Sequence, residues 1–309
     1  MRILLITNMY PTARCEYSGV FVKREVDALL KLEGIDDLRV FFIDTVSRAS
    51  RYVTQRDAVA AAVREYSPDV IHVHYGLTLI AVPTTAIPVV VTFHGSDLGI
   101  WWQRVISRNL ARRAAALVVV SPQMVPALAG LKAPVSVIPC GVDTSVFEPR
   151  DRSAARAALG LPQIGTLVAF PSSAGPGVKN YPLFVDAISR LDGVEPVLLG
   201  GTSPGDMPLW LSAIDVVVYT SDREGSPVLS KEALCCGTRV VAVPAGDLAT
   251  QVDGLAGCRI VQSRRPADLA AAIAEVLTEP GPDARIAAER FSATAEARAV
   301  LDVYRGLVS

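Results

Sequence analysis

The chain has 309 residues, half of them hydrophobic, and Lys and Arg nearly balance Asp and Glu to leave a net charge of −1. This length is typical of two domains of about 150 residues with separate cores, and the balanced charge argues against nucleic acid as a partner. The five cysteines are odd in number and scattered, and no apolar run approaches the ~20 residues of a membrane span, so the composition indicates a protein of the reducing cytoplasm.

Apolar runs alternate with amphipathic stretches through the first half of the chain. Strands are expected at residues 2–7, 38–43, 70–73, 89–93, 117–120 and 135–138, and helices at 20–30, 57–66 and 100–115. This alternation predicts an α/β fold with a parallel, doubly wound sheet, in which ligands bind at the carboxyl ends of the strands. The loop at residues 8–19 lacks the GxGxxG spacing that cradles a dinucleotide, which argues against a nicotinamide-dependent dehydrogenase.

Three histidines lie at or near the carboxyl ends of predicted strands. His72 and His74 are two residues apart, so both face one side of a strand, and such a pair can belong to a metal site. No cysteine or carboxylate cluster in the sequence completes that site, so local hydrogen bonds are expected for both and no metal is assigned. His94 leaves an apolar strand and enters a glycine-containing loop with Asp97 three residues on, a position that suits ligand binding or catalysis.

A basic helix with aromatic residues at its start is expected between Trp101 and Arg113. In the simpler interpretation its arginines are solvated and its tryptophans pack against the domain. In the alternative, this helix contacts anionic lipid or a lipid-linked acceptor, and the cytoplasmic protein associates peripherally with a membrane.

The polar stretch EPRDRS at residues 148–153 is expected to link two domains. The sequence therefore divides into a first domain at 1–148, a second at 149–291 and a closing helix at 292–309. Within the second domain, strands are expected at 166–170, 194–199, 216–219, 239–243 and 259–261, and helices at 154–159, 182–191, 208–214, 266–277 and 283–291. The pattern predicts a second sheet of the same class.

Two glutamates frame the stretch DVVVYTSDREGSPVLSKEALCCGTRVVAV at residues 215–243. Ser226 and Pro227 predict a helix start, because a Ser side chain can cap free N–H groups and Pro is tolerated at the first helical position. Glu224 then lies just before the helix and Glu232 inside it, on an apolar element where a carboxylate needs a partner. A helix N-terminus with nearby carboxylates suits phosphate and sugar hydroxyls.

A second loop, PSSAGPGVKN at residues 171–180, places Lys179 just ahead of a predicted helix, an arrangement that suits a diphosphate. Each of these residues also has a simpler interpretation. Lys179 can be an ordinary surface lysine and Glu224 a solvated loop residue, and Glu232 can pair with Lys231 or Arg239.

Taken together, these segments resemble the retaining glycosyltransferases of the GT-B type, family four, a group that includes bacterial mannosyl- and N-acetylglucosaminyltransferases. The resemblance covers nearly the whole chain and rests on the stretch at 215–243 and on NMYP…SGVF, DVIHVHYG, TFHGSD, VIPCGVDTSVF, VKNYPLF and FSATAEARAVLDVYRGL. It implies a compact GT-B fold, in which two Rossmann-like, doubly wound domains face a cleft and the last helix crosses back to the first domain. The first domain would hold the acceptor and the second the nucleotide sugar.

The resemblance also implies a role for each matched residue. His94 would contact the donor sugar near the reaction centre, Glu224 would hold the transferred sugar, and Lys179 would neutralise the leaving diphosphate. Glu232 would hold the ribose hydroxyls. The remaining expected donor contacts are Gly19, Ser173, Gly225, Ser226 and Pro227.

The implied activity is retaining transfer of a sugar from a nucleoside-diphosphate sugar to an unidentified acceptor, without a metal, since no acidic pair with DxD spacing accompanies these motifs. The alternatives are a GT-B sugar phosphorylase and a non-catalytic nucleotide-sugar-binding module. The chain departs from the family in three places. The loop before Lys179 lacks the usual Arg, the segment at 202–207 is shorter than the strand and base-reading loop usually found there, and the segment between Asp44 and Asp57 is short.

Overall fold

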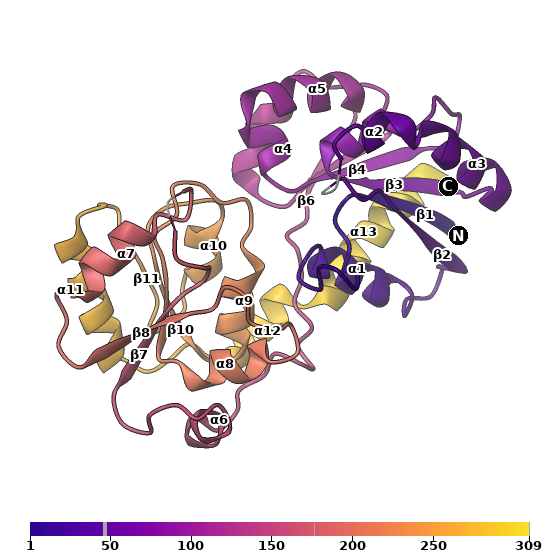
Figure 1. Ribbon diagram of the computed structural model, residues 1–309. Coiled ribbons are helices and arrows are strands. Elements are labelled where there is room, and N and C mark those ends of the chain that lie inside the picture. Colours follow the sequence, from indigo (N-terminus) through magenta and orange to yellow (C-terminus); the bar gives the residue numbers. More distant parts are fainter. Residues whose placement is uncertain (46–47, 176, 309) are drawn as a thin grey trace. The chain divides into compact units, whose positions relative to one another are not determined.

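The computed structural model describes residues 1–45, 48–175 and 177–308, and in it the chain forms two units. One comprises Met1–Gly141 with Ala293–Ser309, and the other comprises Val142–Ser292 (Figure 1). The junction thus lies ahead of the boundary expected at residue 148. Val142 and Phe147 are buried in the core of the second unit, which explains the earlier junction.

The first unit contains a six-stranded parallel sheet in the order β2-β1-β3-β4-β5-β6. Its strands are β1 (Arg2–Thr7), β2 (Asp37–Phe42), β3 (Val70–His74), β4 (Val89–Phe93), β5 (Ala116–Val119) and β6 (Val135–Val137). The continuous apolar character of β3, β4 and β5 matches their complete burial, as is usual for parallel strands covered on both faces.

Helices of very different length connect these strands. They are α1 (Val20–Leu29), α2 (Arg51–Thr54), α3 (Arg56–Tyr66), α4 (Ser96–Gly99) and α5 (Trp101–Ala111), with 3₁₀ turns η1 (Gly76–Ile80) and η2 (Pro122–Leu128). The closing helix α13 (Ala293–Val308) packs against α1 within the same unit. Its buried Val300, Leu301 and Tyr304 join Val26 and Leu29 of α1 in one core.

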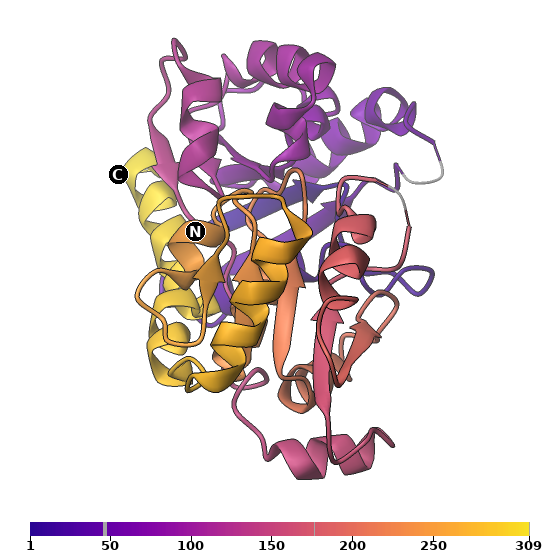
Figure 2. The same cartoon turned by 90° about the vertical axis from the view of Figure 1, so that its left-hand side faces the viewer.

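The second unit contains a five-stranded parallel sheet in the order β11-β10-β9-β7-β8. Its strands are β7 (Thr166–Phe170), β8 (Val194–Leu198), β9 (Val216–Tyr219), β10 (Arg239–Ala242) and β11 (Arg259–Ile260). Its helices are α6 (Arg152–Ala158), α7 (Tyr181–Ile188), α8 (Met207–Ala213), α9 (Val228–Cys235), α10 (Leu248–Val252), α11 (Pro266–Thr278) and α12 (Ala284–Phe291). Helices α7 and α11 cover one face of this sheet, and α8, α9 and α12 cover the other (Figures 1 and 2). A separate apolar cluster lies on each face.

Each sheet has one point at which the strand order reverses, between β1 and β3 in the first unit and between β7 and β9 in the second. Loops that follow two such strands leave the sheet in opposite directions and open a crevice, where α/β proteins bind ligands. The fold therefore singles out residues 8–19 in the first unit, and residues 171–180 and 220–227 in the second. Of these, Pro176 lies outside the described residues.

Candidate functional site

The two loops at the reversal point of the second unit meet through Lys179 and Glu224. Lys179 Nζ donates to Glu224 Oε1 at 2.7 Å, and Ser221 Oγ donates to the same oxygen at 2.6 Å. The Glu224 side chain is only 9% exposed, whereas that of Lys179 is 39% exposed. The pair expected to act in catalysis is thus brought together, with the carboxylate covered and the ammonium accessible to an anion.

The backbone of these loops is held by side chains on both sides. Thr220 Oγ1 lies 2.9 Å from the backbone oxygens of both Lys179 and Asn180, and can donate to either. Arg264, just before α11, donates to Asp222 Oδ1 at 2.8 Å and to the Ser221 carbonyl at 2.9 Å. Arg264 belongs to no motif and its partner loop lies far from it in the chain, so its contact could not be predicted from the sequence.

Ser226 does not act as the helix cap that its position suggested. The N-cap of α9 is Pro227, which has no side-chain cap bond. The Ser226 hydroxyl donates to Asp247 Oδ2 at 2.7 Å and accepts from Lys231 Nζ at 2.7 Å. Since neither side chain caps the first turn of α9, its free N–H groups are suited to bind an anion.

A glycine in the loop after β10 allows the backbone around Gly225 to take its position. Gly246 has a positive φ of 55°, and a Cβ there would lie 2.3 Å from the Gly225 carbonyl oxygen. The next residue, Asp247, is buried, and its burial raises the pKa of its carboxyl group, with Lys231 acting in the opposite direction. Gly246, Asp247 and Lys231 are parts of this site that the motif spacing did not identify.

The other expected donor contacts lie near the same strand ends. Ser173 is exposed at the end of β7, and its backbone lies so close to Gly200 that a Cβ on Gly200 would be 2.1 Å from the Ser173 nitrogen. Glu232 is buried within α9. The guanidinium of Arg239, one partner considered for Glu232, donates to the Glu279 carbonyl at 2.6 Å.

In the first unit, Asp97 shapes the turn that carries His94. The Asp97 carboxylate accepts from the backbone N–H groups of His94, Gly95 and Gly76 at 2.9 to 3.2 Å. Asp97 is completely buried, and this burial raises the pKa of its carboxyl group to about 6, although the three backbone donors oppose the shift. The carboxylate therefore joins the ends of β3 and β4.

The His94 ring is held between two other rings. Its Nε2 lies 3.0 Å from His74 Nδ1, and the two imidazoles stack with centroids 5.2 Å apart. Phe21 of α1 contacts the His94 ring with centroids 5.0 Å apart. Burial, and then the neighbouring His74, lower the pKa of His94 well below its usual value, so the ring is a neutral hydrogen-bonding group at pH 7.

Gly19 occupies the N-cap of α1 with a positive φ of 66°. A Cβ at this position would lie 2.2 Å from the carbonyl carbon of Met9, so glycine is required for the loop after β1 to fold onto the start of the helix. Because Phe21 on the same helix contacts His94, Gly19 and His94 belong to the same edge of the first unit.

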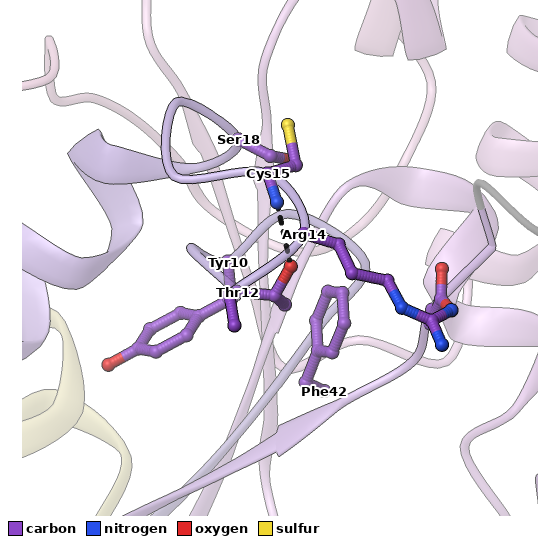
Figure 3. Close-up of a pocket in the computed structure, with 8 residues that line it drawn as sticks. Tyr10, Thr12, Arg14, Cys15, Ser18 and Phe42 are labelled. Carbon is purple, nitrogen blue, oxygen red and sulfur yellow. Dashed lines mark hydrogen bonds between the residues drawn. The ribbon is translucent and has the colours of Figure 1, made fainter. Parts of the chain in front are cut away.

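A pocket of about 420 Å³ lies beside this edge (Figure 3), and no motif in the sequence predicted it. Its lining residues come from the loop after β1 and from the end of β2: Tyr10, Thr12, Ala13, Arg14, Cys15, Ser18, Phe42 and Asp44. Arg51 donates to Asp44 Oδ2 at 3.1 Å, and the backbone nitrogen of Cys15 donates to Thr12 Oγ1 at 3.2 Å. The pocket thus combines an aromatic wall with charged groups of both signs.

Helix α5 exposes its aromatic residues. The side chains of Trp101 and Trp102 are 72% and 44% exposed, so they do not pack into the domain as the simpler interpretation required. Arg108 donates to the backbone carbonyls of Ala127 and Ala129. Among the described residues, no helix is both long and apolar enough to cross a membrane.

Each half of the chain matches the model of a known protein family. Residues 8–146 match the model of Glycosyltransferase Family 4, and residues 173–279 match that of Glycosyl transferases group 1. The D-inositol 3-phosphate glycosyltransferases of Stackebrandtia nassauensis and Mycobacterium tuberculosis (strain ATCC 25177 / H37Ra) are each 32% identical to the chain, over 193 and 195 residues. These matches cover 50% and 52% of the chain but only 43% and 40% of the relatives, so the likeness spans less than half of their length.

Solved structures resemble the chain over nearly its full length. Sucrose-phosphate synthase from Thermosynechococcus elongatus superposes with a TM-score of 0.83 at 20% identity, covering 99% of this chain and 98% of that one. Anabaena Alr3699/HepE in complex with UDP-glucose gives 0.74 at 18% identity, covering 98% and 99%. The likeness establishes the GT-B fold expected from the sequence. The first half of the chain is thus similar to Glycosyltransferase Family 4 and the second half to Glycosyl transferases group 1, both within the GT-B fold.

Proposed function

We propose that the protein transfers a sugar, with retention of configuration, from a nucleoside-diphosphate sugar to an acceptor hydroxyl. The observation that carries this proposal is the contact between Lys179 and Glu224 at the point where the strand order of the second sheet reverses. Solved relatives support the donor class, since Alr3699/HepE was crystallised with UDP-glucose and starch synthase IV from Arabidopsis thaliana with ADP and acarbose.

The charges at this site suit cleavage of a sugar–phosphate bond. Departure of the diphosphate leaves negative charge on its oxygens, which a lysine ammonium and the N-terminus of α9 can stabilise without a metal ion. When the diphosphate draws Lys179 away, the Glu224 carboxylate becomes free to accept hydrogen bonds from the hydroxyls of the transferred sugar. The two partners of this salt bridge would therefore supply two separate contacts to the donor.

The remaining roles follow from position and charge. Ser173, Gly225, Ser226 and Pro227 would border the diphosphate, and buried Glu232 would accept from the ribose hydroxyls. In the first unit, neutral His94 would hydrogen-bond the donor sugar, and the backbone at Gly19 would approach the phosphates.

For the acceptor we propose the pocket beside Phe42. An aromatic wall with a few charged groups is typical of pockets that bind a hydroxylated ring, and Arg14 would pair with an anionic substituent on that ring. The curated relatives are named for D-inositol 3-phosphate, a ring of this chemical kind. We also propose that exposed Trp101 and Trp102, beside the arginines of α5, let the protein bind anionic membranes peripherally.

The function is tested by incubating the protein with UDP-, GDP- and ADP-sugars and a panel of polyol phosphates, sugars and lipid extracts. Formation of a glycosylated product with release of the nucleoside diphosphate supports the proposal, and NMR of the anomeric proton determines whether configuration is retained. Sugar 1-phosphate formed only with inorganic phosphate would instead identify a phosphorylase. Donor binding without turnover would identify a binding module.

The membrane contact is tested by flotation with anionic vesicles at low salt, where surface electrostatics are least screened. Replacing Trp101 and Trp102 by Ala is expected to reduce vesicle binding several-fold. Ile164→Ala, at a 90% exposed apolar residue of the second unit, is the matched control and should bind as the unmodified protein does. Failure of the unmodified protein to float would remove this part of the proposal.

A further inference from the structure

A buried cluster in the first unit brings together three groups that bind metals in other proteins. Glu25 lies on α1, and His72 and His74 lie on β3, with the side chains of both histidines completely buried and that of Glu25 only 4% exposed. One ligand atom from each lies within 4.8 Å of the others. The sequence analysis found no carboxylate to complete the histidine pair, because Glu25 precedes it on a separate element and reaches it only in the fold.

Two distances within this cluster are close to those around a small tetrahedral cation. Glu25 Oε1 lies 3.4 Å from His74 Nε2 and 3.5 Å from His72 Nδ1. Ligand bonds of about 2.0–2.1 Å at tetrahedral angles place neighbouring ligand atoms about 3.3 Å apart. The two distances from Glu25 Oε1 to the histidine nitrogens thus have the spacing of a metal site.

Two of the three ligand atoms have no hydrogen-bond partner among the described residues. Glu25 Oε1 and His74 Nε2 are both buried and face each other without a hydrogen bond of acceptable geometry. A buried polar atom without a partner costs about 1–3 kcal/mol, so such atoms are rare in folded proteins. A cation between them would satisfy both.

The outward-facing nitrogens of the two histidines are already oriented by neighbours. His72 Nε2 lies 2.8 Å from Thr92 Oγ1, and His74 Nδ1 lies 3.0 Å from His94 Nε2. Hydrogen bonds at the far nitrogen fix the tautomer that presents a lone pair to a metal. His72 Nδ1 itself lies 2.6 Å from the Tyr304 hydroxyl, within hydrogen-bond distance.

We propose that Glu25, His72 and His74 bind a divalent cation of the zinc class. The ion would connect α1 and β3 inside the first unit. It would be a structural ion and takes no part in the proposed transfer reaction, so the two proposals stand or fall separately.

The charge of the cluster is consistent with this assignment. Glu25 also interacts with Glu296 of α13, whose Oε2 accepts from the Gly141 backbone at 2.8 Å. A divalent cation would compensate the charge of these two neighbouring carboxyl groups.

The test uses the whole 309-residue chain, unfolded and refolded once with chelator and once with Zn²⁺ or Co²⁺, because the site is buried and must fill as the unit folds. We expect one equivalent of metal per chain by mass spectrometry, a higher Tm than in the chelated protein, and the visible bands of tetrahedral Co²⁺. Glu25→Gln and His74→Gln should each weaken binding at least about 100-fold. Cys15→Ser, which removes the exposed thiol, is the matched control and should bind normally.

If the two variants do not fold, the Co²⁺ spectrum of the unmodified protein still decides the question. Nitrogen and oxygen ligands without sulfur charge-transfer bands would support the site. Sulfur bands, binding below one equivalent, or full binding by folded Glu25→Gln would overturn the proposal.

Discussion

At the scale of single residues, Lys179 and Glu224 form a salt bridge in the structure, and we propose that each binds a different part of the donor. In the structure each neutralises the other, and partial exposure of Lys179 limits what the pair contributes to stability. The sequence predicted both residues, because each stands beside a turn in a recognisable motif. It did not predict Arg264 or Asp247, whose contacts with the loop at 220–227 depend on strand order rather than on local spacing.

Replacing Lys179 or Glu224 by Ala should lower turnover at least about 10²-fold while leaving the protein folded, because each change removes a transition-state contact of a partly exposed ion pair. Steady-state kinetics and chemical denaturation measure the two effects. Lys132→Ala, at an exposed lysine of the first unit, is the control. Near-normal rates in both site variants would refute their assigned roles.

Asp97 provides a prediction about pH. Burial raises its carboxyl pKa to about 6 in the folded protein, from the ordinary value of 3.8 that applies to the unfolded chain. The folded state therefore retains this proton to higher pH than the unfolded chain does. Stability should therefore fall as pH rises from about 4 to about 6, by on the order of 3 kcal/mol from this group. Urea unfolding at several pH values, in chelating buffer, should show this slope in the unmodified protein and a smaller one in Asp97→Asn. Equal slopes would contradict the assignment.

At the scale of elements, the sequence predicted almost every strand and long helix, because buried parallel strands are continuous apolar runs and long helices repeat over several turns. It missed α2, α4, α10 and the two 3₁₀ turns, which are too short to show a period. The helix start at Ser226 was correct to within two residues, but its capping contact was wrong. The Ser226 hydroxyl instead donates to Asp247, which lies in the loop after β10.

The loops after β9 and β10 approach each other closely at Gly246, and a substitution there tests this contact. Gly246→Ala would place a Cβ 2.3 Å from the Gly225 carbonyl and should cost about 2–4 kcal/mol of stability, with loss of donor binding. Gly254→Ala is the matched control, because it has a similar positive φ but no atom within 4 Å, and should cost about 1 kcal/mol. Equal losses of stability in the two variants, measured by guanidinium unfolding, would show that Gly246 and Gly225 are not in close contact.

At the scale of the whole molecule, the chain returns to its first unit after completing the second. The closing helix was expected from its helical spacing, and its buried residues join α1 in the core. The exact junction was not predictable, because Val142 and Phe147 lie ahead of the polar stretch that marked it, and composition alone does not say which core buries them. The cluster of Glu25, His72 and His74 could not be predicted from the sequence either, since its three residues come together only when α1 packs on β3.

Leu301→Ala tests whether the closing helix α13 shares a core with α1, which lies far from it in the sequence. The buried side chain belongs to the core of the first unit, so its loss should destabilise that unit by about 2–5 kcal/mol. Hydrogen exchange should accelerate in peptides from α1 and β1 while peptides from β7 and β9 stay protected. Acceleration confined to residues 293–308 would contradict the shared core.

The donor site at Lys179 and Glu224 can be tested by calorimetric titration of the unmodified protein and of Lys179→Ala with UDP, GDP and ADP. We predict that one of these diphosphates binds the unmodified protein with 1:1 stoichiometry, and at least about 10-fold more weakly to Lys179→Ala, because the ammonium contacts the diphosphate. Equal affinity in the two proteins, or no binding of any of the three by the folded unmodified protein, would contradict a donor site at Lys179 and Glu224.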